Sequence, residues 1–286
     1  MLRIWRMSGK FRVGVILIAI VMLAGLVQPL VNSLFFGGGD PLERGTYPIY
    51  LPISREHLLG TDRLGRDNFA LLILGIRYSL VVGVLAGITA TGIGIVVGFI
   101  AGYMGGFFDA LLRSFTDMLL VIPTFPILVV LAVFVPRLDL PVMALLLAAF
   151  SWPFAARAIR AQVLSLRSRP YVDLAKITGE SDLEIIFTEL VPNLLPYLGL
   201  GLASSIVGAM FAVVGLEVIG LAPGGIASLG LLLSWALSWG VMAQAPLWHM
   251  ILAPAGVLTI LFVGLNLINI GMEEVYNPRL SAVTGR

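Results

Sequence analysis

Long apolar segments constrain the fold of this chain more than any other feature. A helix needs about 20 mostly apolar residues to cross the hydrocarbon core of a bilayer. Six segments meet that requirement, at residues 13–36, 79–104, 110–135, 140–156, 194–219 and 250–272. A further apolar stretch, 226–241, is short and rich in Gly, Ser and Trp, which favours a re-entrant or surface element. The sequence therefore predicts an all-α polytopic membrane protein with six transmembrane helices.

The composition of the 286 residues agrees with this prediction. Hydrophobic residues make up 59% and charged residues 12%, against about 45–50% and about 25% in soluble domains. So few charges exclude a cytosolic enzyme, a disordered chain and a DNA-binding domain. We therefore expect the chain to contact a lipid bilayer and no nucleic acid. The chain has no cysteine, and its two histidines, His57 and His249, lie far apart in the sequence. We therefore expect no metal site.

The distribution of basic residues predicts the orientation, because Lys and Arg concentrate in cytoplasmic segments. With a cytoplasmic N-terminus, the inside segments hold Arg3, Arg6, Lys10, Arg12, Arg157, Arg160, Arg167, Arg169, Lys176, Arg279 and Arg286. The outside segments hold fewer: Arg44, Arg55, Arg63, Arg66, Arg77 and Arg137. We expect both termini in the cytoplasm. The first apolar run is long and lacks a small-x-small cleavage site, which favours a retained helix over a signal peptide.

These spans divide the chain into three parts. Residues 1–36 form an N-terminal tail and the first transmembrane helix, and residues 37–78 form an extracytoplasmic segment. Residues 79–286 form the core, with five transmembrane helices and a cytoplasmic loop at 157–192. None of the polar segments is large enough to bury a core of its own. Any soluble activity must therefore come from partners.

Catalytic motifs are missing from the chain. It contains no G-x-x-x-x-G-K-[ST] phosphate loop, since Gly9-Lys10 lacks both the upstream glycine and the following hydroxyl. It also contains no G-x-S-x-G elbow and no H-E-x-x-H helix. We therefore expect no catalytic residue, no ATPase activity and no bound cofactor in this chain.

Three ionisable residues lie deep within the predicted spans. Arg113 and Asp117 are four residues apart, so they share a helical face and can pair. They are either a self-neutralised pair or a contact to another chain or to a transport path. Glu217 has no basic partner nearby in the sequence, and is either a structural cap near the outer surface or a path or partner contact.

Glycines recur on one face of the second span. Gly83 and Gly87 form a small-xxx-small pair, and Gly94, Gly98 and Gly102 continue the pattern. Such a face lets another helix approach closely. The partner helix belongs either to this chain or to another subunit.

Residues 171–196 form the most distinctive cytoplasmic segment. Apolar residues recur with helical spacing on both sides of Gly179, which predicts two short helices separated by that glycine. Ser181 and Glu184 have the spacing of a capping box for the second helix. Pro192 and Pro196 then mark the entry to the fifth span. The segment is either an amphipathic surface element or an element that docks into a groove of a cytoplasmic partner.

This segment resembles the "EAA" loop of permease subunits in bacterial ABC importers, E-A-A-x3-G followed by nine residues and I-x-L-P. Asp173, Leu174 and Ala175 stand where E-A-A would be, and Gly179 and Pro192 match the glycine and the proline. The first acid is shortened and one alanine is replaced by leucine, so the match is imperfect.

A second stretch, H-L-L-G-T-D-R-L-G-R-D at 57–67 followed by G-I-R-Y-S-L, resembles a signature of the dipeptide/oligopeptide/nickel permease family, in the second of its two permease types. Its motif residues are Gly60, Thr61, Asp62, Gly65, Arg66 and Asp67. They either form a structural loop over the outer mouth or serve as a docking site or gate. Residues 152–171 and Asn277-Pro278-Arg279 also follow the family pattern, although the usual G-D-x-L-R-D-x-L-D-P ending is altered.

The resemblance implies a type I ABC importer permease fold in the inner membrane. It implies that the chain forms half of a translocation path with a second, homologous permease. Two P-loop ATPases, which use ATP and Mg, would dock on the cytoplasmic loops, and an extracytoplasmic binding protein would deliver the substrate. Di- and oligopeptides are the first expectation, with nickel or oligosaccharides as alternatives and a secondary transporter as the alternative of another class. The expected coupling contacts are Leu174, Ala175, Ile177, Gly179, Leu183 and Ile186.

Overall fold

The computed structural model describes residues 8–135, 139–222 and 226–276. Five helices in these ranges are long and apolar enough to cross a membrane, and a bent pair of helices brings the number to six. Several residues used in the orientation and family arguments lie outside the described ranges: Arg3, Arg6, Arg137, Asn277, Pro278, Arg279 and Arg286.

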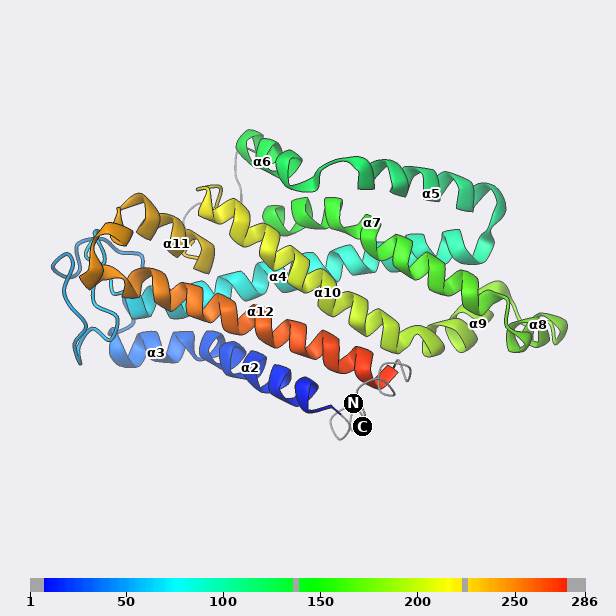
Figure 1. Cartoon of the computed structure of the whole chain (residues 1–286), viewed down its shortest axis with the longest axis horizontal. Coiled ribbons are helices and arrows are strands. Elements are labelled where there is room, and N and C mark those ends of the chain that lie inside the picture. Colours follow the sequence, from blue (N-terminus) through cyan, green and yellow to red (C-terminus); the bar gives the residue numbers. More distant parts are fainter. Residues whose placement is uncertain (1–7, 136–138, 223–225, 277–286) are drawn as a thin grey trace.

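The helices follow one another as an up-and-down bundle whose long axis is horizontal in Figure 1. The long helices are α2 (Gly9–Leu26), α4 (Asn68–Phe99), α7 (Leu140–Arg167), α10 (Val191–Val218) and α12 (His249–Tyr276). The shorter ones are α3 (Gln28–Phe35), α5 (Gly106–Val121), α6 (Thr124–Phe134), α8 (Pro170–Ile177), α9 (Asp182–Ile185) and α11 (Leu229–Ser238). Two π-helical turns, Ile100–Met104 and Ile186–Leu190, extend α4 and precede α10, and two 3₁₀ turns, Val241–Ala243 and Ala245–Leu247, lead into α12.

The two ends of the bundle differ. One end carries α8 and α9, and we call it the α8–α9 end (Figure 1). The other end carries the segment 37–67 and α11, and we call it the loop end (Figure 1). The start of α2 and the end of α12 both lie toward the α8–α9 end, where the Lys10 ammonium pairs with the Glu274 carboxylate.

The glycine face of the second span packs within this chain. Gly83 and Gly87 lie against Met210 and Ile206 of α10. Farther along α4, Gly94, Gly98 and Gly102 lie against α7. A Cβ atom at Gly98 would stand only 2.9 Å from the Ala156 carbonyl oxygen. The glycine face therefore packs against helices of this chain, which is one of the two alternatives that the sequence left open.

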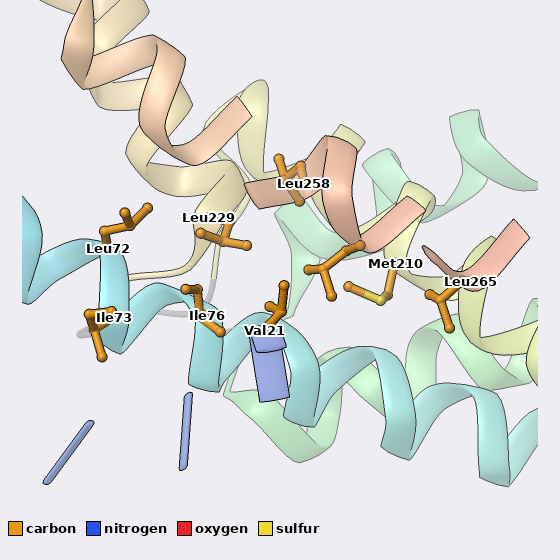
Figure 2. Packing of buried hydrophobic residues seen from close by; sticks show 9 residues of the cluster. Val21, Leu72, Ile73, Ile76, Met210, Leu229, Leu258 and Leu265 are labelled. Atoms are coloured by element: carbon orange, nitrogen blue, oxygen red, sulfur yellow. The ribbon is translucent and has the colours of Figure 1, made fainter. Parts of the chain in front are cut away.

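One buried cluster joins five helices (Figure 2). Its members are Val21 of α2, Leu72, Ile73 and Ile76 of α4, Met210 of α10, Leu229 of α11, and Leu258, Leu261 and Leu265 of α12. Because these helices are far apart in the sequence, the cluster fixes the N-terminal and C-terminal helices against the centre of the bundle.

The third predicted span, 110–135, is broken rather than continuous. Helices α5 and α6 meet at an angle of 81°. Pro123 supplies the cause, because a proline disfavours the helical conformation in the residue before it. Ile122 accordingly has the extended angles φ −72° and ψ 124°.

Other boundaries also differ from the sequence-based expectation. Helix α4 begins at Asn68 rather than near residue 79, because the Asp67 carboxylate accepts hydrogen bonds from the amides of Phe69 and Ala70. Helix α7 continues to Arg167, so the first part of the predicted loop 157–192 is helical. Pro192 lies in the first turn of α10, and the helix passes through Pro196 instead of starting after it.

The stretch 226–241 does not form a seventh span. Its helix α11 has 10 residues, which is about 15 Å of helix and half of what a bilayer requires. Ser228 caps its start, and Gly240 with φ +68° follows its end.

The packing of α4 on α7 gives a first prediction. Gly98→Ala should lower stability by about 1–3 kcal/mol, because the added methyl group overpacks the contact with Ala156 and Ile159. Gly92→Ala on the same helix is the matched control, since no atom lies within 4 Å of its Cβ position. The melting temperature of the purified protein in detergent measures both variants. Equal melting temperatures would contradict the close approach.

Candidate functional site

The α8–α9 segment is built by two complementary helix caps around Gly179. Helix α8 ends in a Schellman motif, in which the Glu180 amide donates to the Ala175 carbonyl at 3.1 Å and the Gly179 amide donates to the Lys176 carbonyl at 3.2 Å. Gly179 has φ +88°, which a residue without a Cβ adopts without strain. Ser181 and Glu184 form the predicted capping box at the start of α9. The two predicted helices and their glycine break are thus confirmed.

One face of this segment is buried in the bundle. Val172 and Ile185 are completely buried, and Leu190 joins them in a cluster with Phe99 of α4 and Val163 of α7. Ala175 belongs to the same inward face. Ile186 also packs against this cluster. The side chains of these last two residues therefore help to hold the segment onto its own bundle, and their expected contact with a partner stays a prediction.

The opposite face of the segment is apolar and exposed. It consists of Leu174, Ile177, Leu183 and Phe187, with Ile177 83% and Leu183 69% exposed. The four residues lie on both sides of the Gly179 break, and Asp173 is exposed beside them. We call this set the docking face. Nothing in the described part of the chain covers it.

A groove of ≈ 560 Å³ lies between α6, α7 and α10. Its wall on α10 is a stripe at helical spacing, formed by Tyr197, Gly201, Ser204, Ser205, Gly208 and Ala212. Its wall on α7 includes Ser151 and two phenylalanines, Phe150 and Phe154. Glu273 of α12 is the one acidic or basic side chain among its described lining residues.

The small and hydroxylated residues distinguish this surface from a lipid-facing one. Ser204 is exposed and accepts a hydrogen bond from the Asn269 side-chain amide at 3.2 Å. Hydroxyl groups are unfavourable on a surface that faces lipid tails, because hydrocarbon offers them no hydrogen-bond partner. The groove therefore fits contact with water, with a polar ligand or with another subunit.

Ion pairs join α5 to α7. Asp117 accepts from the Arg157 guanidinium at 2.6 Å, and Asp109 binds Arg160 through both carboxylate oxygens. The predicted partner, Arg113, is farther away, with its Nε 3.9 Å from an Asp117 oxygen. The pairing of Arg113 with Asp117 is thus present, but the closer contact of Asp117 is to a different helix, which the spacing along α5 did not reveal.

Glu217 lies near the end of α10, and its side chain faces α11. Its side chain is 1% exposed and rests against Gly230, where a Cβ atom would collide with it. It is absent from the lining of the groove. Of the two roles considered for Glu217, the structural one at the loop end agrees with this position.

The outer-loop motif residues form a compact, tightly packed loop. Gly60 and Gly65 have φ +62° and +69°. Both sit directly against backbone carbonyls, those of Leu51 and Tyr47, so that neither position has room for a side chain. The Thr61 hydroxyl donates to the Pro48 carbonyl at 2.6 Å and accepts from the Leu51 amide at 2.8 Å.

The charged residues of the motif are buried and paired with one another. Asp62 accepts from the Arg66 guanidinium at 2.7 Å, and the same guanidinium lies over the Trp235 ring of α11 at 4.2 Å. Asp67 caps α4 and contacts His57 Nδ1 at 2.8 Å. The motif thus joins the segment 37–67 to α4 and α11, which supports the structural reading over a free docking loop.

Several residues of the site were missed from the sequence. The stripe on α10 carries a readable signal, since G-L-A-S-S-I-V-G at 201–208 repeats small residues every three to four positions. The contact of Tyr103 with Asp182, whose atoms are 2.8 Å apart, has no such signal. It depends on which helices meet, and periodicity alone does not determine that.

Comparison with known proteins agrees with this architecture. Residues 94–282 match the family of binding-protein-dependent transport system inner membrane components, and the chain belongs to this family. It is therefore a multi-pass component of the inner membrane in a transport system.

Three relatives have high coverage. A putative peptide transport system permease protein of Brucella suis is 32% identical over 273 residues, covering 95% of this chain and 88% of that protein. The oligopeptide transport system permease protein OppC of Mycobacterium tuberculosis is 32% identical over 231 residues, covering 79% and 77% of the two chains. The OppC protein of Bacillus subtilis is 28% identical over 284 residues, covering 96% and 88%.

A solved structure shares the fold. A chain of the inward-facing MetNI methionine ABC transporter has a TM-score of 0.53 and 19% identity, covering 70% of this chain and 96% of that chain. The expected type I ABC importer permease fold is confirmed by this likeness.

The buried pair in the outer loop gives a second prediction. Asp62→Ala should destabilise the protein by about 3–5 kcal/mol, because it leaves the buried Arg66 guanidinium without its counter-ion. Arg63→Ala is the matched control, since that neighbouring side chain is exposed. Thermal unfolding in detergent compares the two variants. A loss at Arg63 as large as at Asp62 would show that the loop is sensitive to any change.

Proposed function

We propose that this chain is the permease subunit of an ATP-driven importer and forms half of a translocation path for di- or oligopeptides. Its membership of a family of binding-protein-dependent transport components supports the importer. The names of the three relatives support peptides as the substrate class. An extracytoplasmic binding protein would deliver the peptide at the loop end.

The proposal places the α8–α9 end in the cytoplasm, together with the start of α2 and the end of α12. The described Lys and Arg residues support that orientation by their excess. Seven are assigned to this side, Lys10, Arg12, Arg157, Arg160, Arg167, Arg169 and Lys176, against five on the other side, Arg44, Arg55, Arg63, Arg66 and Arg77. Positive charge accumulates on the cytoplasmic side of membrane proteins.

The docking face is the single observation that carries the proposal. Four large apolar side chains project from a short segment that is tightly capped and anchored on its other face. An exposed apolar face beside polar and charged groups is typical of a surface that binds another protein. The partner that fits the importer is a P-loop ATPase subunit, one for each permease. That subunit, rather than this chain, would bind ATP and Mg.

The groove supplies the path in this proposal. A second, homologous permease would close its open side, so that the small and hydroxylated stripe of α10 faces an aqueous passage. Hydroxyl groups both donate and accept hydrogen bonds, and so they fit the amide backbone shared by all peptides. ATP binding and hydrolysis would shift the population between inward-facing and outward-facing arrangements through the docked segment.

The docking face can be tested by a charge substitution. Ile177→Glu should remove most of the ATPase from the purified complex, because an isolated carboxylate in an apolar contact is strongly unfavourable. Ile53→Glu is the matched control, since Ile53 is also exposed but lies in the segment at the loop end. Quantitative mass spectrometry of the complex captured through a tag on this chain gives the ratio of ATPase to permease. An unchanged ratio in Ile177→Glu would overturn the assigned docking face.

The path can be tested by thiol labelling, because the chain contains no cysteine. Ser204→Cys in the groove should react with a charged, water-soluble maleimide about tenfold faster than Ile20→Cys, since a thiol in apolar surroundings has a raised pKa and forms less thiolate. Ile20 is exposed on α2, away from the groove. Equal, slow labelling at both positions in the assembled complex would show that the groove does not face water.

A further inference from the structure

Tyr103 connects the end of α4 to the α8–α9 segment, which carries the docking face and which we call the docking segment. It lies in the π-helical turn Ile100–Met104, and its side chain is 5% exposed. Its hydroxyl donates to the Asp182 carboxylate at 2.8 Å. Asp182 is the first residue of α9. In the described part of the chain, this is the one side-chain hydrogen bond or ion pair between the α4 extension and residues 168–190.

The ring of Tyr103 is held in place from several sides. It packs in the buried cluster with Val163 of α7 and Ile185 of α9. The guanidinium of Arg167 and the ammonium of Lys176 lie 5.9 Å and 6.0 Å from its centroid. The hydroxyl is thus directed at one acceptor by a ring that has little freedom to turn.

The docking segment follows α7 directly after Arg167, and two π-helical turns connect it to two further long helices. It continues into α10 through the turn Ile186–Leu190, and it contacts α4 at the turn Ile100–Met104. Such turns are rare and frequently occur at functional sites. The connections to α7 and to α10 are covalent. The connection to α4 depends on packing and on the Tyr103 hydroxyl.

We propose that the hydrogen bond from Tyr103 to Asp182 couples the docking segment to α4, so that α4 and α10 move together when the segment is displaced. Tyr103 and Asp182 are positioning residues in this role, which rests on the function proposed above. Helix α4 packs through glycines against both α7 and α10. A displacement passed to α4 therefore reaches both walls of the groove. Without the hydrogen bond, the segment moves relative to α4, and ATP is hydrolysed without a matching movement of the path.

The test uses the complete importer, with its ATPases, partner permease and binding protein, in proteoliposomes. Tyr103→Phe keeps the buried ring and removes only the hydroxyl. We expect the complex to assemble and to hydrolyse ATP, while the peptide taken up per ATP falls about tenfold, the scale of losing one hydrogen bond to a charged group. A structural role alone would lower assembly and leave this ratio unchanged.

Tyr171→Phe is the matched control. Tyr171 packs against the same cluster, but its buried hydroxyl has no hydrogen-bond partner among the residues that the structure describes. Its removal should leave the ratio of uptake to hydrolysis unchanged. Asp182→Ala should reproduce the defect, whereas Asp182→Asn keeps an acceptor oxygen and should restore most of the coupling. The double variant Tyr103→Phe/Asp182→Ala should be no worse than either single one, because both remove the same contact.

Two results separate this inference from the proposed function. Normal uptake per ATP in both Tyr103→Phe and Asp182→Ala would overturn the coupling role while leaving the docking face in place. An equal loss in Tyr171→Phe would also overturn it, since the effect would then belong to the cluster and not to the hydrogen bond. Retention of the ATPase by Ile177→Glu would instead refute the docking face itself.

Discussion

The hydrophobic effect contributes little to the association of helices inside a bilayer, because lipid tails are as apolar as the side chains that they contact. Close approach of backbones, with its many van der Waals contacts, takes over that role. Helix α4 makes such contacts along most of its length, with α10 through Gly83 and Gly87 and with α7 through Gly94, Gly98 and Gly102. The positions of the groove and of the docking segment both follow from this central packing.

The remaining helices are attached to this centre in different ways. Helices α2 and α12 also pack through glycine, since Gly14 lies against the Gly264 backbone and Gly271 against Phe11. Helix α5 is joined to α7 by the pairs Asp117–Arg157 and Asp109–Arg160. The loop end is closed by buried hydrogen bonds around Asp62 and Asp67. The α8–α9 end, by contrast, leaves large apolar side chains exposed.

The sequence predicted those features that depend on local chemistry. Apolar length identified the spans, and the spacing of Ser181 and Glu184 identified a capping box that the structure contains. The break of the third span at Pro123 was missed, although the proline is visible in the sequence. Prolines alone are ambiguous, since α10 passes through Pro196 without breaking. The partners of Asp117 and Tyr103 depend on which helices adjoin, and no local pattern carries that information.

The groove is bounded by two kinds of contact. Between α4, α7 and α10 the backbones touch, and such a contact has no second arrangement that keeps its packing. The contact of α5 with α7 combines stacked aromatic rings, Phe115 on Trp152, with long charged side chains. The Asp117 carboxylate lies 2.6 Å from the Arg157 guanidinium and 3.9 Å from that of Arg113. Exchanging one partner of an ion pair for another costs little free energy. Overpacking a close contact at a glycine costs much more. Because α5 continues into α6, which lines the groove with Thr124, Phe125 and Leu128, these ion pairs support the same wall of the groove that the buried Leu128 side chain holds against α7 and α10.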